Sequence, residues 1–254
     1  MDTGNANPRN SRNTRNATPA THAMSTVGVV DAIVELRQYA LRPGARDALV
    51  ELFEREFVTG QETAGITVGG RFRDLDDPDR FVWLRSFPDM AARERALHAF
   101  YDGPVWQAHR EAANATMLDS DDVLLLRGPG FAAPDAGGPV VATVCHPLDA
   151  EAFARHFERR LRPALTAAGC APRAVHRTEH AQNTFPALPV RTGEEVLVWF
   201  TAGEAGPLPD LSAHLRAAPQ RLRLEPVRRA RGRGERVVAP GVRPGPAADA
   251  ARDA

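Results

Sequence analysis

The sequence contains no lysine, and all 32 of its basic residues are arginine. Chemistry that needs a lysine amine, such as Schiff-base formation or the phosphate contact of a P-loop, is therefore excluded. The arginine-rich chain is also rich in alanine, glycine and proline, which is typical of proteins encoded by GC-rich genomes. We therefore expect a bacterial source.

Cysteine is scarce as well. Cys145 and Cys170 are the only two cysteines, they lie 25 positions apart, and no CxxC motif or metal-ligand spacing accompanies them. The sequence thus predicts neither a disulfide framework nor a structural zinc site. We expect no bound metal and no cofactor, with haem left open as an alternative.

The chain also lacks an excess of charge of either sign and a long apolar run. Its 32 acidic residues balance the 32 basic ones. This balance gives no electrostatic reason to expect a nucleic-acid or anionic-membrane partner. No run of about 18 apolar residues is present, and the first residues lack the apolar core of a secretory signal. We therefore expect no membrane span and a cytoplasmic location.

Composition divides the chain into five parts. Residues 1–28 are rich in Asn, Thr and Arg, and residues 231–254 in Pro, Ala and Gly, so both tails are expected to be disordered. A Gly/Pro-rich segment, 129–139, is typical of a linker. The two remaining parts, 29–128 and 140–230, carry the periodic apolar patterns of folded units.

The first unit has the pattern of strand, helix, strand, strand, helix, strand. After a strand at 32–41, apolar residues recur at helical spacing at Leu49, Leu52, Phe53 and Phe57. Two strands flank the turn-forming Asp76-Asp77-Pro78-Asp79, which predicts a hairpin. A helical stretch capped by Asp89 is interrupted at 102–104, and the segment DDVLLLR closes the unit as a strand.

The second unit repeats this order. A strand, VVATVCHPL, precedes a helix that Asp149 can cap, and the segments RAVHRTEH and EEVLVWFTA predict a hairpin with a long loop. A short helix in LSAHLRAAP and a strand in QRLRLEPVRR follow. Because Trp199 occupies the place that Trp83 has in the first unit, a tandem duplication is the simplest account. The prediction is an α+β fold of two ferredoxin-like βαββαβ units, with their sheets packed into a barrel-like core.

The first strand has two unlike faces. Val34 and Leu36 share one face, while Glu35, Arg37 and Tyr39 share the other. If the aliphatic face packs on the helices, the polar face points into the space between the two sheets. Trp83 and Arg85 are expected on the same polar face, where they form a wall for a planar ligand or a cation–π filler of the core.

Four segments of the first unit resemble the NIPSNAP family: VELRQYALRPG, FVWLRSFPDM, FYDGPVWQAHREAANATM and DSDDVLLLR. The resemblance covers roughly residues 32–127 and is weaker over 140–230. It implies the dimeric α/β-barrel form of the ferredoxin-like fold, which is shared with antibiotic-biosynthesis and haem-degrading monooxygenases and muconolactone isomerases. It implies no settled reaction, because the best-studied members are scaffold or trafficking-related proteins.

Two interpretations of the candidate residues are open. Arg37 either forms a structural ion pair with Glu35 or Glu62, or holds an anionic ligand in a bidentate fork, with Tyr39 as a hydrogen-bond donor. His109 is the candidate general base, because its ordinary pKa lies near neutrality, and Trp106 lies three residues before it on the same helical face. Both residues are also compatible with a purely structural role.

The function predicted first is therefore binding or scaffolding through a pocket between two sheets, with a small anionic or planar ligand. The alternative is cofactor-independent monooxygenation or isomerisation, with His109 as base and Arg37 and Tyr39 binding an anionic intermediate. Whether the protein is an enzyme stays open at this point. So does the choice between a barrel closed within one chain and one closed in a homo-oligomer.

Overall fold

The computed structural model describes residues 31–131, 138–204 and 206–227. The predicted tails at 1–28 and 231–254, and residues 132–137 of the predicted linker, lie outside these ranges. Within them, no helix has the length and apolar character needed to cross a bilayer.

The described strands form one closed barrel in the order β1-β3-β2-β8-β5-β7-β6-β4. Every pairing between neighbouring strands is antiparallel. The strands are β1 (Asp31–Leu41), β2 (Thr67–Asp74), β3 (Arg80–Phe87), β4 (Met117–Pro129), β5 (Val140–Cys145), β6 (Ala174–Thr178), β7 (Leu197–Ala202) and β8 (Gln220–Pro226).

The barrel consists of two four-stranded halves with the same internal order. In the first half the order is β4-β1-β3-β2, and in the second it is β8-β5-β7-β6. Short pairings of β2 with β8 and of β4 with β6 join the halves. The barrel therefore closes within one chain, and the predicted α+β class is confirmed. A duplication as the origin of the two halves stays a prediction.

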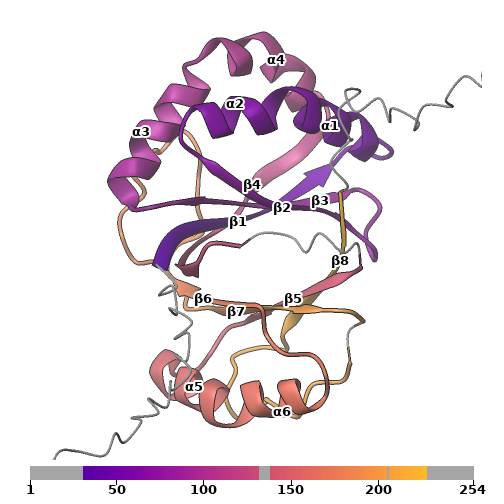
Figure 1. Cartoon of the computed structure of the whole chain (residues 1–254), viewed down its shortest axis with the longest axis vertical. Helices are drawn as coiled ribbons and strands as arrows, with labels where there is room; N and C mark the ends of the chain where they lie inside the picture. Colours follow the sequence, from indigo (N-terminus) through magenta and orange to yellow (C-terminus); the bar gives the residue numbers. More distant parts are fainter. Residues whose placement is uncertain (1–30, 132–137, 205, 228–254) are drawn as a thin grey trace, which may run out of the picture.

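The helices cover the two outer faces of the barrel (Figure 1). In the first half, α1 (Arg46–Leu52) continues through a π-helical turn, η1 (Phe53–Phe57), into α2 (Val58–Thr63), and α3 (Met90–Tyr101) precedes α4 (Pro104–Asn114). In the second half, α5 (Ala150–His156), the π-helical turn η2 (Phe157–Leu161) and α6 (Arg162–Ala167) are likewise continuous. Both predicted caps are present, because Asp89 accepts from the Ala92 N–H at 2.7 Å and Asp149 from the Ala152 N–H at 2.8 Å.

The helix predicted in LSAHLRAAP is wrong. Residues 211–219 form turns and one isolated bridge between Pro147 and Leu215. Leu211 and Leu215 are buried as their spacing suggested. However, the segment is too short to form a helix without support, and its backbone bonds instead to the turn after β5, with Arg216 N donating to the His146 carbonyl at 2.8 Å.

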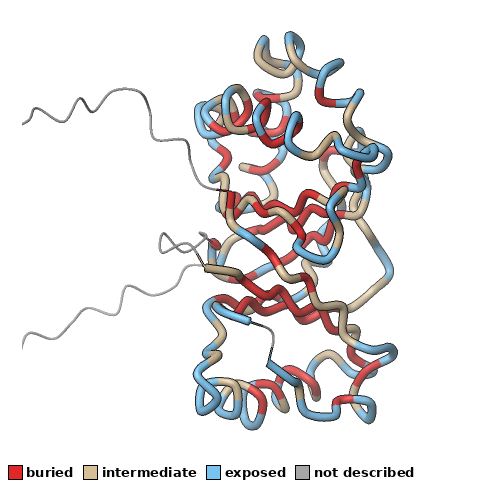
Figure 2. The backbone as a smooth tube through the Cα atoms, turned by 90° about the vertical axis from the view of Figure 1, so that its right-hand side faces the viewer, coloured by how far each residue is buried: buried red, intermediate tan, exposed pale blue. Residues whose placement is uncertain are grey.

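The space between the two halves is filled by apolar side chains, aliphatic and aromatic, and not by the polar face of β1. Val34 and Leu36 point inward and pack in one cluster with Val144, Val198 and residues of β4 and β8. Figure 2 shows these strands as the most continuously buried part of the molecule. The prediction that Glu35, Arg37 and Tyr39 point between the sheets is therefore wrong. The apolar faces of the two half-barrels bury each other instead, which removes apolar surface from water on both sides.

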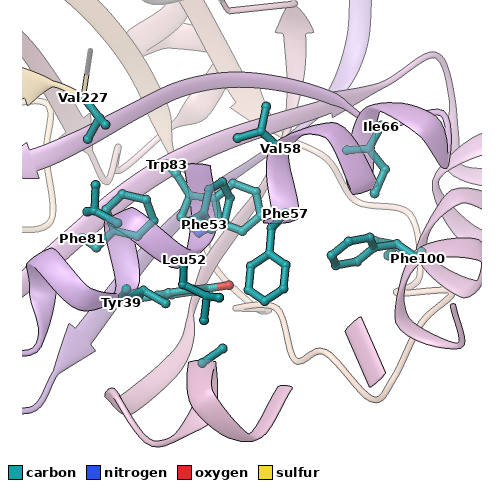
Figure 3. Packing of buried hydrophobic residues seen from close by; sticks show 14 of the residues in the cluster. Tyr39, Leu52, Phe53, Phe57, Val58, Ile66, Phe81, Trp83, Phe100 and Val227 are labelled. Atoms are coloured by element: carbon teal, nitrogen blue, oxygen red, sulfur yellow. The ribbon is translucent and has the colours of Figure 1, made fainter. Parts of the chain in front are cut away.

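The polar face of β1 lies beneath the helices of the first half. Tyr39 and Trp83 pack there with Phe53 and Phe57 of η1 (Figure 3). The Trp83 and Phe53 rings are 4.8 Å apart, and in the second half the Trp199 ring is 5.1 Å from Phe157. Both π-helical turns begin with Phe-Glu-Arg and place that Phe on the Trp of the third strand of their half.

Candidate ligand-binding site

One carboxylate and three guanidinium groups meet beneath the helices of the first half. Glu35 Oε2 accepts from Arg37 Nη1 at 2.6 Å and from Arg85 Nε at 2.7 Å, while Oε1 accepts from Arg93 Nε at 2.7 Å. None of these four side chains is more than 1% exposed. We call these four residues the charged cluster.

Three elements position the charged cluster. Glu35 and Arg37 are two residues apart on β1 and so share a face. The antiparallel register sets Arg85 of β3 directly opposite Glu35, and Trp83 opposite Arg37. Arg93 enters from the first turn of α3, which Asp89 caps.

The charged cluster carries an excess of positive charge. Burial alone would raise the pKa of Glu35, but the charges of Arg85, Arg37 and Arg93 outweigh burial and hold that pKa well below its usual range. Glu35 is therefore ionised at neutral pH. Three cations against one anion leave the cluster with a net charge of +2.

Neutral polar groups take up some of the remaining donors. Arg37 Nε donates to the Tyr39 hydroxyl at 3.0 Å, and Arg85 Nη1 lies 3.3 Å from the Tyr101 hydroxyl and 3.4 Å from Gln61 Oε1. Arg93 Nη1 donates to Asn183 Oδ1 at 3.0 Å. Three buried donors in and beside the charged cluster have no hydrogen-bond acceptor: Trp83 Nε1, Arg85 Nη2 and Arg93 Nη2.

Aromatic rings surround the guanidinium groups. The Cζ atom of Arg85 lies 5.3 Å from the centre of Trp83 and 5.7 Å from that of Tyr101. Arg37 Cζ lies 5.5 Å from Tyr39 and 5.6 Å from Trp83. At these distances the rings stabilise the cations by cation–π interaction.

The structure brings together five of the seven residues singled out in the sequence: Glu35, Arg37, Tyr39, Trp83 and Arg85. Trp106 touches this group through Tyr101, with ring centres 4.9 Å apart. His109 lies outside it, because its side chain is 33% exposed and its Nε2 atom is 3.5 Å from Glu56 on η1. A catalytic role for His109 stays a prediction.

Sequence reasoning missed Arg93 and Asn183. Arg93 had a recognisable signal, since it precedes Leu97 and Phe100 by four and seven residues and so lies on the buried face of α3. A charged residue on such a face requires a buried partner. Asn183 had no such signal. It lies in the long connection between β6 and β7, and it is near the cluster only because this connection crosses the first half of the barrel.

The second half has no charged residues at the corresponding positions. Thr143 is opposite Trp199, just as Arg37 is opposite Trp83, and Val141 is opposite Thr201, just as Glu35 is opposite Arg85. Val141, Thr143 and Thr201 are all buried and uncharged. A cluster of this kind is thus present once in the described ranges.

Metal-binding groups are not part of the site. Across the described ranges, no group of three or more His, Cys, Asp or Glu side chains could hold a metal ion. The charged cluster offers hydrogen-bond donors, positive charge and aromatic surface.

Comparison with known proteins finds a family match in the first half of the chain. Residues 34–128 match the family model of NIPSNAP, which confirms the resemblance inferred from the sequence. A search of curated proteins finds no sequence match.

Some solved structures are similar to this chain over both halves of the barrel, and others over one half only. A protein from Fusobacterium nucleatum, provisionally named a monooxygenase, is 9% identical with a TM-score of 0.52, covering 79% of this chain and 94% of its own. An anthrone oxidase-like protein is 13% identical with a TM-score of 0.52, covering 78% and 92%. A NIPSNAP family protein from Agrobacterium tumefaciens is 19% identical with a TM-score of 0.36, covering 41% and 92%. At such identities the first two similarities show the fold alone.

Proposed function

We propose, with the NIPSNAP domain at residues 34–128 as the premise, that this protein binds a small organic anion at the charged cluster. The observation that carries the proposal is the sharing of one carboxylate by three buried arginines. The proposed binding place is the charged cluster and not the pocket expected between the two sheets, because the space between the sheets is filled by apolar side chains.

The charge of the ligand follows from the charge of the cluster. A buried cation is costly unless its charge is compensated, and one carboxylate pairs with all three guanidinium groups but neutralises only one of the three positive charges. The three buried donors without an acceptor, on Trp83, Arg85 and Arg93, add a second unmet requirement. Anionic oxygen atoms meet both, since they supply negative charge and accept several hydrogen bonds.

The shape of the ligand follows from the aromatic surroundings. Tyr39, Trp83 and Tyr101 present ring surface around the guanidinium groups. A planar conjugated molecule bearing a carboxylate or similar anion matches such a site better than an inorganic ion, because the rings offer apolar contact beside the charge. The second half has no equivalent cluster, so we expect one ligand per chain.

A second candidate function is cofactor-independent oxidation or isomerisation. It is favoured by the shared fold with proteins named as a monooxygenase and as anthrone oxidase-like. The guanidinium groups would stabilise an anionic intermediate, and burial raises the pKa of Tyr39, which keeps its hydroxyl protonated as a donor. This reaction also needs a base, and His109 lies at the surface with Glu56, so we place binding first.

Binding is tested by titrating the protein with benzoate, salicylate and 1-naphthoate, with benzamide as the uncharged counterpart. We expect the anions to bind with a stoichiometry of one per chain and benzamide to bind far more weakly. Arg93→Met should reduce anion affinity about tenfold or more, because it removes one cation that faces the ligand. The matched control is Arg95→Met, on the exposed side of the same helix.

The outcomes separate the candidates. A wild-type protein that binds none of the anions would overturn the proposed function. Equal losses in the Arg93 and Arg95 variants would show that binding occurs elsewhere. An oxygenated or isomerised product of a bound probe, detected by mass spectrometry or chromatography in air without added cofactor, would move the second candidate to first place.

A further inference from the structure

The connection between β6 and β7 crosses from the second half onto the first. We call residues 179–196 the strap. In Figure 1 it is the pale orange coil that climbs from the lower sheet to α3. It is attached to β4 at its first residue and again at Arg191, because Glu179 N donates to the Leu125 carbonyl and Arg191 N to the Val123 carbonyl, both at 2.9 Å.

Asn183 of the strap closes one side of the charged cluster. Its Oδ1 atom accepts from Arg93 Nη1 at 3.0 Å and from Phe185 N at 3.1 Å, while its Nδ2 atom donates to the Leu188 carbonyl at 2.9 Å. The amide group is therefore held in one orientation, with its oxygen toward Arg93. This oxygen satisfies one donor of Arg93 but adds no negative charge.

Phe185 extends the aromatic wall from the same strap. It is buried, and its ring centre lies 5.7 Å from Tyr101 and 4.8 Å from His98 of α3. Tyr101 in turn contacts Arg85 through its hydroxyl group. The strap thus contributes one polar and one aromatic side chain to a site whose other members all belong to the first half.

We propose that the strap is the specificity-determining element of the site and that the lack of charge on Asn183 keeps the site selective for anions. This inference rests on the proposed binding function. Because Asn183 is neutral, Arg93 keeps a full positive charge and a free Nη2 donor for the ligand. An aspartate at this position would pair with Arg93 and lower the positive charge that attracts an anion.

The test compares benzoate with benzamide in Asn183→Asp, with Asn114→Asp at the exposed end of α4 as the matched control. We expect Asn183→Asp to lower benzoate affinity about tenfold or more at neutral pH, with little change for benzamide. Its melting temperature should change by the balance of two opposed effects, because the new carboxylate pairs a buried cation but loses the hydrogen bond that Asn183 Nδ2 donates to the Leu188 carbonyl. Asn114→Asp should leave both affinities unchanged.

Asn183→Ala separates charge from structure. It removes the contact with Arg93 without adding charge, so the preference for benzoate over benzamide should persist. If Asn183→Ala loses benzoate as severely as Asn183→Asp, the residue is merely structural and the inference is overturned. Wild-type binding of benzoate that Asn183→Asp does not change would also overturn it, while the proposed function would stand. A wild-type protein that binds neither compound overturns the proposed function itself.

Discussion

Arg85 and Glu35 lie directly opposite each other on β3 and β1, and a 2.7 Å hydrogen bond from Arg85 Nε to Glu35 Oε2 joins them in a fully buried environment. The same carboxylate also accepts from Arg37 and Arg93. The relationship is therefore unequal: each arginine has one carboxylate, while the carboxylate has three arginines. Removing the acid should cost more than removing any one base.

Glu35→Gln should destabilise the fold by about 3–5 kcal/mol, because it leaves three buried guanidinium groups without a counter-charge. Arg37→Met should cost roughly half as much or less, since Glu35 keeps Arg85 and Arg93. Urea unfolding of both variants gives the comparison. Glu51→Gln, in an exposed pair with Arg55, is the control and should be nearly neutral. A larger loss for Arg37→Met than for Glu35→Gln would contradict the shared-carboxylate arrangement.

Phe53→Ala and Phe157→Ala should each cost about 3–5 kcal/mol, because both rings are buried against a tryptophan beneath a π-helical turn. The two losses should be similar if the halves are packed alike. Thermal or urea unfolding measures them. A nearly neutral Phe157→Ala would mean that the second half adds little to the stability of the whole barrel.

Stability should fall as the pH drops from about 6.5 to about 4, because burial lowers the pKa of His176 from 6.5 to about 4. His176 Nε2 donates to the Pro129 carbonyl at 2.7 Å, and its buried Nδ1 atom has no partner for a second proton. In this pH range the unfolded chain binds a proton that the folded chain does not, so acid favours unfolding. The loss at pH 4 should reach about 3 kcal/mol.

His176→Gln should flatten this pH dependence when unfolding is followed between pH 7 and 4.5. The remaining slope in this range comes from groups such as His156, whose pKa is lowered by partial burial and by the charges of His214 and Arg160. A second loss below about pH 4.5 should persist in the variant, because the lowered pKa of Glu35 makes the folded state resist protonation there. An unchanged slope above pH 4.5 would assign the effect to other groups.

A thiol reagent such as dithionitrobenzoate should label one cysteine per native chain and two per unfolded chain. Cys145 is fully buried beneath α5, and burial raises the pKa of its thiol to about 12, so its thiolate is rare. Cys170 is partly exposed after α6 and should react first. Peptide mapping identifies the labelled residue, and native labelling of Cys145 would mean that α5 opens readily.

Much of this architecture is predictable from local patterns. The alternation in β1, the turn cluster at Asp76–Asp79 and the caps Asp89 and Asp149 each depend on neighbours in sequence, and each was predicted correctly. The orientation of β1 was not. Alternation shows that Glu35 and Arg37 share a face. Both faces of this strand are buried, however, so the alternation does not say which face packs on the helices and which packs on the other half of the barrel.

Two further features were not predicted because they depend on contacts between residues far apart in the sequence. Asn183 reaches Arg93 across 90 positions of the sequence, and its place depends on where the strap crosses the barrel. The failed helix at 211–219 had the right apolar spacing at Leu211 and Leu215, but tertiary hydrogen bonds to the turn after β5 prevailed over a short local preference.

The closure of the barrel within one chain also has a genetic consequence. When two identical chains form a barrel, every mutation appears twice, so a codon change that improves one site alters its copy as well. Here Arg37 and Thr143 occupy matching places in the two halves but are encoded separately. Selection can therefore change the charged cluster of one half and the strap of the other independently.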